Sequence, residues 1–294
     1  MTQPLIAFGT PRKLPRPNQL PGRVVVLDIA FAAGMGGASF ERVTKPFIDG
    51  LGSRLAMWVD HHDHELHARY AQDPRFILAT KAQHGACPEM VTKELVMAAG
   101  PVDSVCCHRD FDGLCSAAKW IRGGEEPYEG ADDDARAIDT RLGRPSERGA
   151  MMDRALRARP NDVALAGLIV RFLASGATDR ELFREVETAS QALRPREDAA
   201  RLYARDYRVS HDVAFVDLPT DHAPYDKTLL LMLGQERARI SIVADGTTVT
   251  VAARFDSGVN LLELFSLQGG MPTVVSLSRS ELPQVLDKLG FTRQ

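Results

Sequence analysis

Short runs of β-branched and apolar residues alternate with helix-like segments through the first half of the chain. The strand-like runs occupy residues 23–28, 54–60, 75–79 and 102–107, and segments with helical periodicity follow or separate them. Parallel pairing suits this pattern, because a crossover between parallel strands has room for a helix and a hairpin turn does not. The first half therefore predicts an α/β fold with a parallel β-sheet flanked by helices.

The rest of the chain divides into two parts of different character. Residues 130–209 have helical periodicity throughout, whereas strand-like runs return from residue 213, with a hairpin turn at 244–247. We expect an N-terminal arm at residues 1–22, a first domain at 23–190, a helical linker at 191–210 and a smaller α/β C-terminal domain at 211–294.

Composition indicates an ordinary globular protein, with 44% hydrophobic and 26% charged residues among 294. A formal net charge of −3 gives no general basic surface for long nucleic acid. No stretch supplies the roughly 18 apolar residues that a membrane span needs. The four cysteines form no CxxC pair. We expect a cytoplasmic protein with buried free thiols, no membrane contact and an oligomeric state that the sequence leaves open.

Three of the predicted strands end in residues that bind metal ions. The first ends in Asp28, the second in the DHHDH run at residues 60–64, and another in the HRDFDG run at residues 108–113. The carboxyl ends of parallel strands meet at one edge of a sheet, so these segments should converge. Carboxylates together with imidazoles favour Mn²⁺, Fe²⁺ or Zn²⁺. Two such ions about 3.5–4 Å apart could activate a water molecule between them.

Each segment also has a plain structural interpretation. An aspartate after a strand often caps a turn, residues 60–64 could be a solvated turn, and residues 108–113 could simply lead into a helix. We favour the metal site, because the plain interpretation requires three coincidences at one sheet edge. His84, which precedes a helical segment, could also face it. The glycine-rich residues 32–39 lack a GK[ST] ending, and we interpret them as a tight turn or a modest anion nest.

These residues resemble the motifs of the DHH phosphoesterase superfamily, which includes exonucleases, cyclic-dinucleotide phosphodiesterases and manganese pyrophosphatases. The family is named for a triplet that stands here as Asp60-His61-His62, and residues 108–113 resemble its aspartate-rich motif. Asp28 resembles the bridging aspartate. Asp139 resembles the last metal-binding aspartate, with Asp132, Asp133 and Asp134 as nearby alternatives. Residues 256–272 are similar to the family's C-terminal substrate-binding domain.

The resemblance implies a phosphoesterase that uses two divalent ions, Mn²⁺ above all, with Mg²⁺, Fe²⁺ or Zn²⁺ as alternatives. By this resemblance the metal ligands are Asp28, which bridges both ions, His108 and Asp110 for one ion, and His61, Asp112 and Asp139 for the other. Asp60 is expected to orient His61, because a ligating imidazole usually donates its second N–H to such a partner. The groups expected to face the substrate are His62, Arg109, Gly269 and Gly270.

Two departures from the family pattern bear on the substrate. The aspartate-rich motif usually comes first in the family but follows the DHH triplet here, so the motif order is permuted. The C-terminal loop has Met271 where the family tends to have histidine. We expect the substrate to be a phosphorylated small molecule, a dinucleotide or a short oligonucleotide. The alternative is a non-hydrolysing metal- and nucleotide-binding protein that retains the fold.

Overall fold

A computed structural model describes residues 3–32, 38–267 and 271–292 of the chain. The chain divides into two compact units, Met1–Gln191 and Ala192–Gln294. Each unit has its own sheet and its own hydrophobic core, so each is described by itself.

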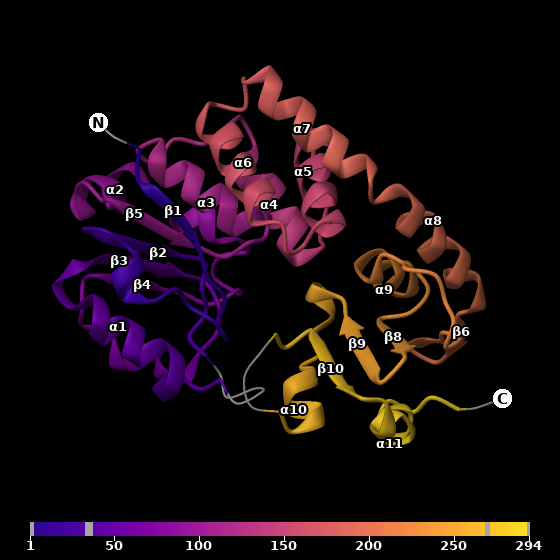
Figure 1. Ribbon diagram of the computed structural model, residues 1–294. Coiled ribbons are helices and arrows are strands. Elements are labelled where there is room, and N and C mark those ends of the chain that lie inside the picture. Colours follow the sequence, from indigo (N-terminus) through magenta and orange to yellow (C-terminus); the bar gives the residue numbers. More distant parts are fainter. Residues whose placement is uncertain (1–2, 33–37, 268–270, 293–294) are drawn as a thin grey trace. The chain divides into compact units, whose positions relative to one another are not determined.

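The first unit contains a five-stranded parallel sheet in the order β1-β5-β2-β3-β4 (Figure 1). Its strands are β1 (Leu5–Phe8), β2 (Val24–Leu27), β3 (Leu55–Asp60), β4 (Phe76–Leu78) and β5 (Ser104–Cys107). The predicted parallel sheet and α/β class are therefore confirmed. The segment expected as an N-terminal arm is extended at residues 5–8, where it adds β1 to the edge of the sheet beside β5.

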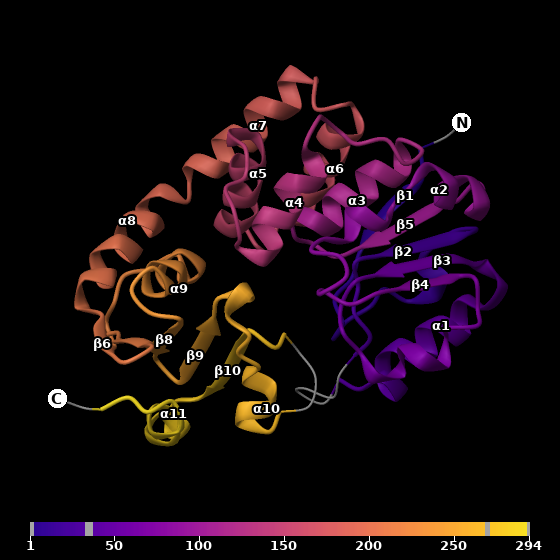
Figure 2. The same ribbon diagram turned by 180° about the vertical axis from the view of Figure 1, so that it is seen from behind.

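Alternate residues of the strands supply two separate cores, one on each face of this sheet. Val24 and Val26 of β2 pack with α1, whereas Val25 and Leu27 pack with α2, α3 and the later helices. Figures 1 and 2 show α1 on one side of the sheet and α2 and α3 on the other. Burial on both faces explains the unbroken apolar runs of these strands. The helices are α1 (Lys45–Leu51), α2 (Lys93–Ala99), α3 (Phe111–Ile121), α4 (Ala131–Thr140), α5 (Glu147–Ala158), α6 (Val163–Ala174) and α7 (Arg180–Gln191).

The second unit is a smaller α/β unit with a mixed sheet in the order β10-β9-β8-β7-β6, as predicted in class. Only the β7–β8 pair is parallel among these strands, and Gly246 (φ 53°) lies in the predicted hairpin turn between β8 and β9. The strands are β6 (Arg208–Ser210), β7 (Val213–Asp217), β8 (Ile240–Asp245), β9 (Thr248–Ala253) and β10 (Val274–Ser278). The helices are α8 (Arg194–Tyr203), α9 (Lys227–Gln235), α10 (Leu261–Phe265) and α11 (Leu282–Lys288).

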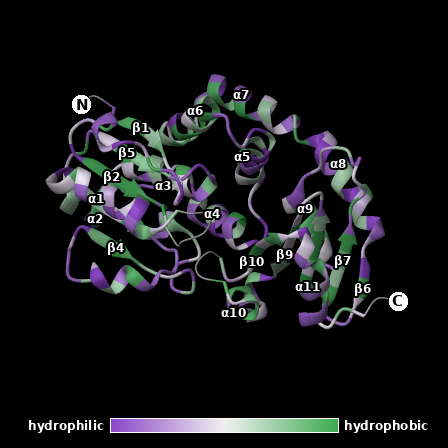
Figure 3. Ribbon diagram, turned by 60° about the horizontal axis from the view of Figure 1, so that its bottom comes forward, coloured by the Kyte–Doolittle hydropathy of each residue, from purple (hydrophilic) through white to green (hydrophobic). Residues whose placement is uncertain are grey.

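Hydrophobic residues concentrate in the strands of both sheets, as Figure 3 shows by colour. All four cysteines are buried and free, as the sequence predicted. The segment expected as a helical linker contains α8, and Ala200 of α8 packs with Leu230 of α9 in the core of the second unit. Across the residues that the structure describes, no helix combines the length and the apolar character needed to cross a membrane.

Candidate metal centre

The predicted convergence of three strand ends is present in the first unit. Strands β5, β2 and β3 are neighbours, and Asp28, residues 60–62 and residues 108–112 lie at or just beyond their carboxyl ends. Side chains of these segments, together with Asp139 of α4, form three groups that could each hold a metal ion, with ligand atoms within 4.8 Å of one another. The groups are Asp28–His61–His62, Asp28–His108–Asp110 and His61–Asp112–Asp139.

Asp28 is shared by two of these groups and has an unusual environment. Its backbone is left-handed (φ 57°), and its N–H donates to the Val59 carbonyl at 2.9 Å. Its carboxylate is fully buried, and both oxygens lack a hydrogen-bond partner among the described residues. Burial, followed by the nearby Asp112 and Asp110, raises the pKa of Asp28 well above its ordinary value. The protein alone therefore leaves this carboxylate poorly compensated.

His61 lies at the junction between the groups and is fully buried. Its Nδ1–H donates to the backbone carbonyl of His84 at 2.9 Å, which directs Nε2 toward the carboxylates. Nε2 lies 3.3 Å from both Asp28 Oδ1 and Asp112 Oδ2. Burial by itself would lower the pKa of His61, but the contacts with Asp112 and Asp28 outweigh it and raise the pKa to about 11. Without another cation, His61 is protonated, and its charge compensates the neighbouring carboxylates.

His108 and Asp110 are the side chains that follow β5 and contribute to the site. Nδ1 of His108 lies 2.7 Å from Asp110 Oδ2 and 3.8 Å from Asp28 Oδ2. The charge of Asp110 outweighs burial and raises the pKa of His108 to about 10. Asp110 is also the N-cap of α3, where it accepts from the N–H of Gly113 at 3.3 Å. The Gly113 N–H is therefore already bonded within the protein.

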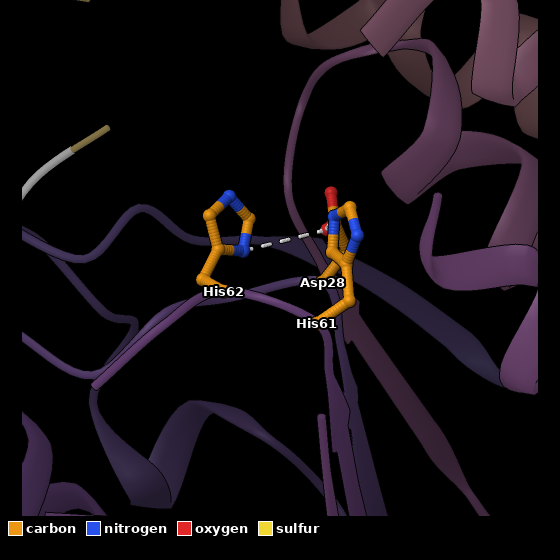
Figure 4. Close-up of side chains that lie close together, drawn as sticks. All are labelled: Asp28, His61 and His62. Carbon is orange, nitrogen blue, oxygen red and sulfur yellow. Dashed lines mark ion pairs between the residues drawn. The ribbon is translucent and has the colours of Figure 1, made fainter. Parts of the chain in front are cut away.

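Asp60 supports His62 and not His61, which corrects the expectation from the sequence. Asp60 Oδ1 accepts from His62 Nδ1 at 2.8 Å, whereas the acceptor for His61 is the His84 backbone. The expectation fails because alternate residues at a strand end point to opposite faces. Asp60 is therefore on the side of His62 and not of His61. Figure 4 shows Nδ1 of His62 turned toward Asp28, 3.9 Å from Oδ1, with the other ring nitrogen on the far side of the ring.

Asp139 reaches this cluster from the last turn of α4, and the three competing aspartates do not. Asp139 Oδ2 lies 3.9 Å from His61 Nε2. Asp132 pairs with the buried Lys119, Asp133 is exposed, and Asp134 accepts from Ser146. Of the four candidates, geometry therefore favours Asp139 as a ligand.

Lys81 is a member of the site that the sequence analysis missed. Its side chain is 6% exposed, and its Nζ lies 2.5 Å from Asp139 Oδ2. Burial by itself would lower the pKa of Lys81, but Asp139 and Asp112 outweigh it and raise the pKa, so the ammonium stays charged. A usable signal existed, because Lys81 follows β4 and so lies at the same sheet edge as the other strand ends.

The remaining predicted site residues either belong to none of these metal groups or lie outside the described residues. Arg109 is half-buried and forms no ion pair or hydrogen bond within the described part of the chain. Gly269 and Gly270 lie outside the described residues, as does most of the glycine-rich segment 32–39. Their predicted roles stay predictions.

The residues present fit a divalent cation. Within the described ranges, the Asp28 oxygens and His61 Nε2 are buried polar atoms with no hydrogen-bond partner, and they face one another. Buried polar atoms are usually paired, so unpaired ones at a single point indicate a missing binding partner. Carboxylate oxygens and an imidazole nitrogen are a donor set for first-row divalent metals.

No family model and no curated protein matches the chain. Among solved structures it is similar to the pGpG-specific phosphodiesterase PggH from Vibrio cholerae, with 13% identity, a TM-score of 0.44, and coverage of 91% of this chain and 97% of the other. It is also similar to exonuclease RecJ bound to manganese, with 12% identity, a TM-score of 0.49, and coverage of 90% of this chain and 74% of the other. Matches at these scores assign neither an activity nor a substrate to this chain.

The residues themselves carry the family likeness. The DHH triplet, the HRDFDG segment, Asp28 and Asp139 come from separate parts of the sequence, and the fold brings them to one place. In its motifs and in their assembly, the chain resembles the DHH phosphoesterase superfamily.

Proposed function

We propose that this protein is a metal-dependent phosphoesterase that uses two divalent ions. The observation that carries the proposal is the assembly of Asp28, His61 and Asp112 around a point where buried ligand atoms lack partners within the described residues. Asp28, His108 and Asp110 would hold one ion, and His61, Asp112 and Asp139 the other. Such ions, when bound, polarise a phosphoryl oxygen and lower the pKa of a coordinated water.

The many carboxylates of the site favour bound cations. Five carboxylates converge there, from Asp28, Asp60, Asp110, Asp112 and Asp139, and Lys81 is the one lysine paired with them in the described part of the chain. In the metal-free protein, the charges of His61, His108 and Lys81 offset part of this negative charge. Cations at the site reverse the sign of the local field, so metal loading and substrate binding should depend on each other.

His62 is the proposed proton donor or electrostatic contact to the substrate. Its Nδ1 is held by Asp60, and its side chain is 22% exposed. With the proton on Nδ1, Nε2 can exchange a proton with a phosphoester oxygen. Asp60 fixes the ring orientation by accepting the hydrogen bond from Nδ1.

The proposed substrate class is a short phosphodiester, such as a dinucleotide or a short oligonucleotide. A net charge of −3 does not favour the many backbone contacts that hold long nucleic acid. The proposed contact for a substrate phosphate is Arg109, which is half-buried, lies between His108 and Asp110 in the sequence and has no partner among the described residues.

The test is hydrolysis of an aryl phosphodiester and of dinucleotides by protein that has been stripped with a chelator and reloaded with Mn²⁺. Asp28→Ala, His61→Ala and Asp139→Asn should each lower turnover by at least a hundredfold. Asp133→Asn is the matched control, because Asp133 is on the same helix as Asp139 but is 77% exposed. It should retain wild-type turnover.

Two results would contradict the proposal in different ways. Unchanged turnover in both Asp28→Ala and His61→Ala would exclude this site as the catalytic centre. Tight Mn²⁺ binding with no turnover on any phosphoester would instead favour a metal- and nucleotide-binding protein that does not hydrolyse.

A further inference from the structure

Lys81 holds one oxygen of a proposed metal ligand. Its ammonium lies 2.5 Å from Oδ2 of Asp139, in a side chain that is 6% exposed. The backbone N–H of Lys81 also lies 3.4 Å from Asp63 Oδ2, which ties the turn after β4 to the DHH segment. This lysine is therefore fixed in the site and is not a surface side chain that happens to reach it.

The oxygen that Lys81 holds is the same oxygen that faces the metal group. Asp139 Oδ2 is the atom 3.9 Å from His61 Nε2. An ion bound between His61, Asp112 and Asp139 would have to share this oxygen with the ammonium or displace it. Two cations on one carboxylate oxygen repel each other strongly in a buried site, where screening by water is weak.

The other proposed metal group, Asp28–His108–Asp110, has no lysine that competes for its carboxylates within the described residues. Asp28 and Asp110 form ion pairs only with histidines within the described residues. A histidine can lose its proton and become a ligand, whereas a lysine paired with a carboxylate keeps its charge. The two metal groups therefore differ in one respect that bears directly on affinity.

We propose that Lys81 is a tethered cation that competes with the divalent ion for Asp139, so that the two metal groups fill in order. The group Asp28–His108–Asp110 fills first, and the group His61–Asp112–Asp139 fills only at higher ion concentration. Lys81 acts through Asp139 and is a positioning residue. The inference rests on the proposed function, since it assumes that these groups bind metal ions.

The experiment is calorimetric titration of the chelator-stripped, full-length protein with Mn²⁺ alone. The wild type should show a tight site and a second site at least tenfold weaker. Lys81→Met removes the ammonium and keeps much of its volume. It should tighten the second site at least tenfold, which is about 1.4 kcal/mol, and change the first site less than threefold.

Lys119→Met is the matched control for removing a buried lysine. Lys119 is 8% exposed in its side chain and also pairs with an aspartate, Asp132, but it lies outside the metal groups. Its replacement should leave both Mn²⁺ affinities unchanged. Asp139→Asn provides a second route if Lys81→Met does not fold: the weak site should disappear and the tight site should persist.

The outcomes separate this inference from the proposed function. A second site that is unchanged or weaker in folded Lys81→Met, or two sites that persist in Asp139→Asn, overturns the competition while leaving the metal centre in place. A wild-type protein that binds no Mn²⁺ at all overturns both the competition and the proposed function.

Discussion

At the residue scale, Asp28 combines two features that cost stability. Its backbone is left-handed, and its buried carboxylate has a pKa well above the ordinary value. The left-handed backbone does not require a charged residue at position 28, because asparagine adopts the same conformation. Residues that lower stability in this way are typical of functional sites, where the cost is offset when the ligand binds.

Asp28→Asn should therefore stabilise the metal-free protein while removing metal binding. The raised pKa means that the folded state holds the proton more tightly than the unfolded chain, so the carboxylate destabilises the fold above its unfolded pKa and ceases to do so below it. We expect a gain of about 0.5–2 kcal/mol at pH 7 in chelator, and a smaller gain at pH 4. Thermal unfolding at the two pH values measures it. A loss of stability at pH 7 would show that the carboxylate is already well compensated.

Asp60→Asn should distinguish the role of His62 from the role of His61. Asp60 bonds to His62, so the change should lower kcat by about 10- to 100-fold and leave Mn²⁺ affinity within about threefold. If Asp60 instead oriented His61, Mn²⁺ affinity would fall by roughly 10- to 100-fold. Titration with Mn²⁺ beside steady-state kinetics distinguishes the two.

The sequence predicted most of the residues that assemble at this site, but not all their contacts. Strand-end position identified Asp28, His61 and Asp112 correctly as neighbours, because a parallel sheet dictates where strand ends meet. It did not identify the partner of Asp60, which depends on the direction of individual side chains. It also missed Lys81, whose contact with Asp139 joins two segments that no local pattern connects.

At the element scale, the N-terminus of α3 packs tightly against the end of β2. A side chain at Gly113 would place its Cβ 2.7 Å from the His108 carbonyl oxygen and 3.0 Å from Asp28 Oδ2. Glycine is therefore required for steric reasons in the first turn of this helix. Because glycine has no side chain, the first turn of the helix can lie directly against the Asp28 carboxylate.

Gly113→Ala should destabilise the protein by roughly 1–3 kcal/mol, although alanine is the better helix former. It should also weaken Mn²⁺ binding, because Asp28 and His108 must move. Gly167→Ala in α6 is the control, because its Cβ would lie 3.6 Å from Arg171 Nη1, which is an ordinary van der Waals distance. It should stabilise by about 0.5–1 kcal/mol. Urea unfolding measures both, and equal effects of the two changes would contradict the steric argument.

Elements with strong periodicity were predicted well, whereas three of the four edge strands were not; the exception is β4 (Phe76–Leu78). The apolar runs at 23–28 and 102–107 predict strands, and the strand residues 24–27 and 104–107 are buried on both faces. β1, β6 and β10 are edge strands, and their burial patterns include exposed positions, so hydrophobic pattern alone does not mark them.

At the scale of the whole molecule, the proposed chemistry is confined to one of the two units. All the metal groups found among the described residues lie within Met1–Gln191. The second unit has its own core and its own sheet. A ligand stabilises the part of a protein that binds it, so metal should act on the two units unequally.

Mn²⁺ should therefore raise the unfolding temperature of the first unit selectively. At a free concentration about 100 times the dissociation constant, one bound ion contributes about 2.7 kcal/mol to the unit that binds it. Scanning calorimetry should show one transition moving up while the other stays in place. Equal shifts of two resolved transitions, or none, would contradict the assignment of the ions to the first unit.

The measurement that tests the central claim most directly is anomalous scattering at the manganese edge from crystals grown with Mn²⁺. We predict two peaks roughly 3.5–4 Å apart at the carboxyl edge of β5, β2 and β3, one beside Asp28, His108 and Asp110 and the other beside His61, Asp112 and Asp139. The absence of any peak beside Asp28 in manganese-saturated crystals, or ions bound only elsewhere, would contradict the account.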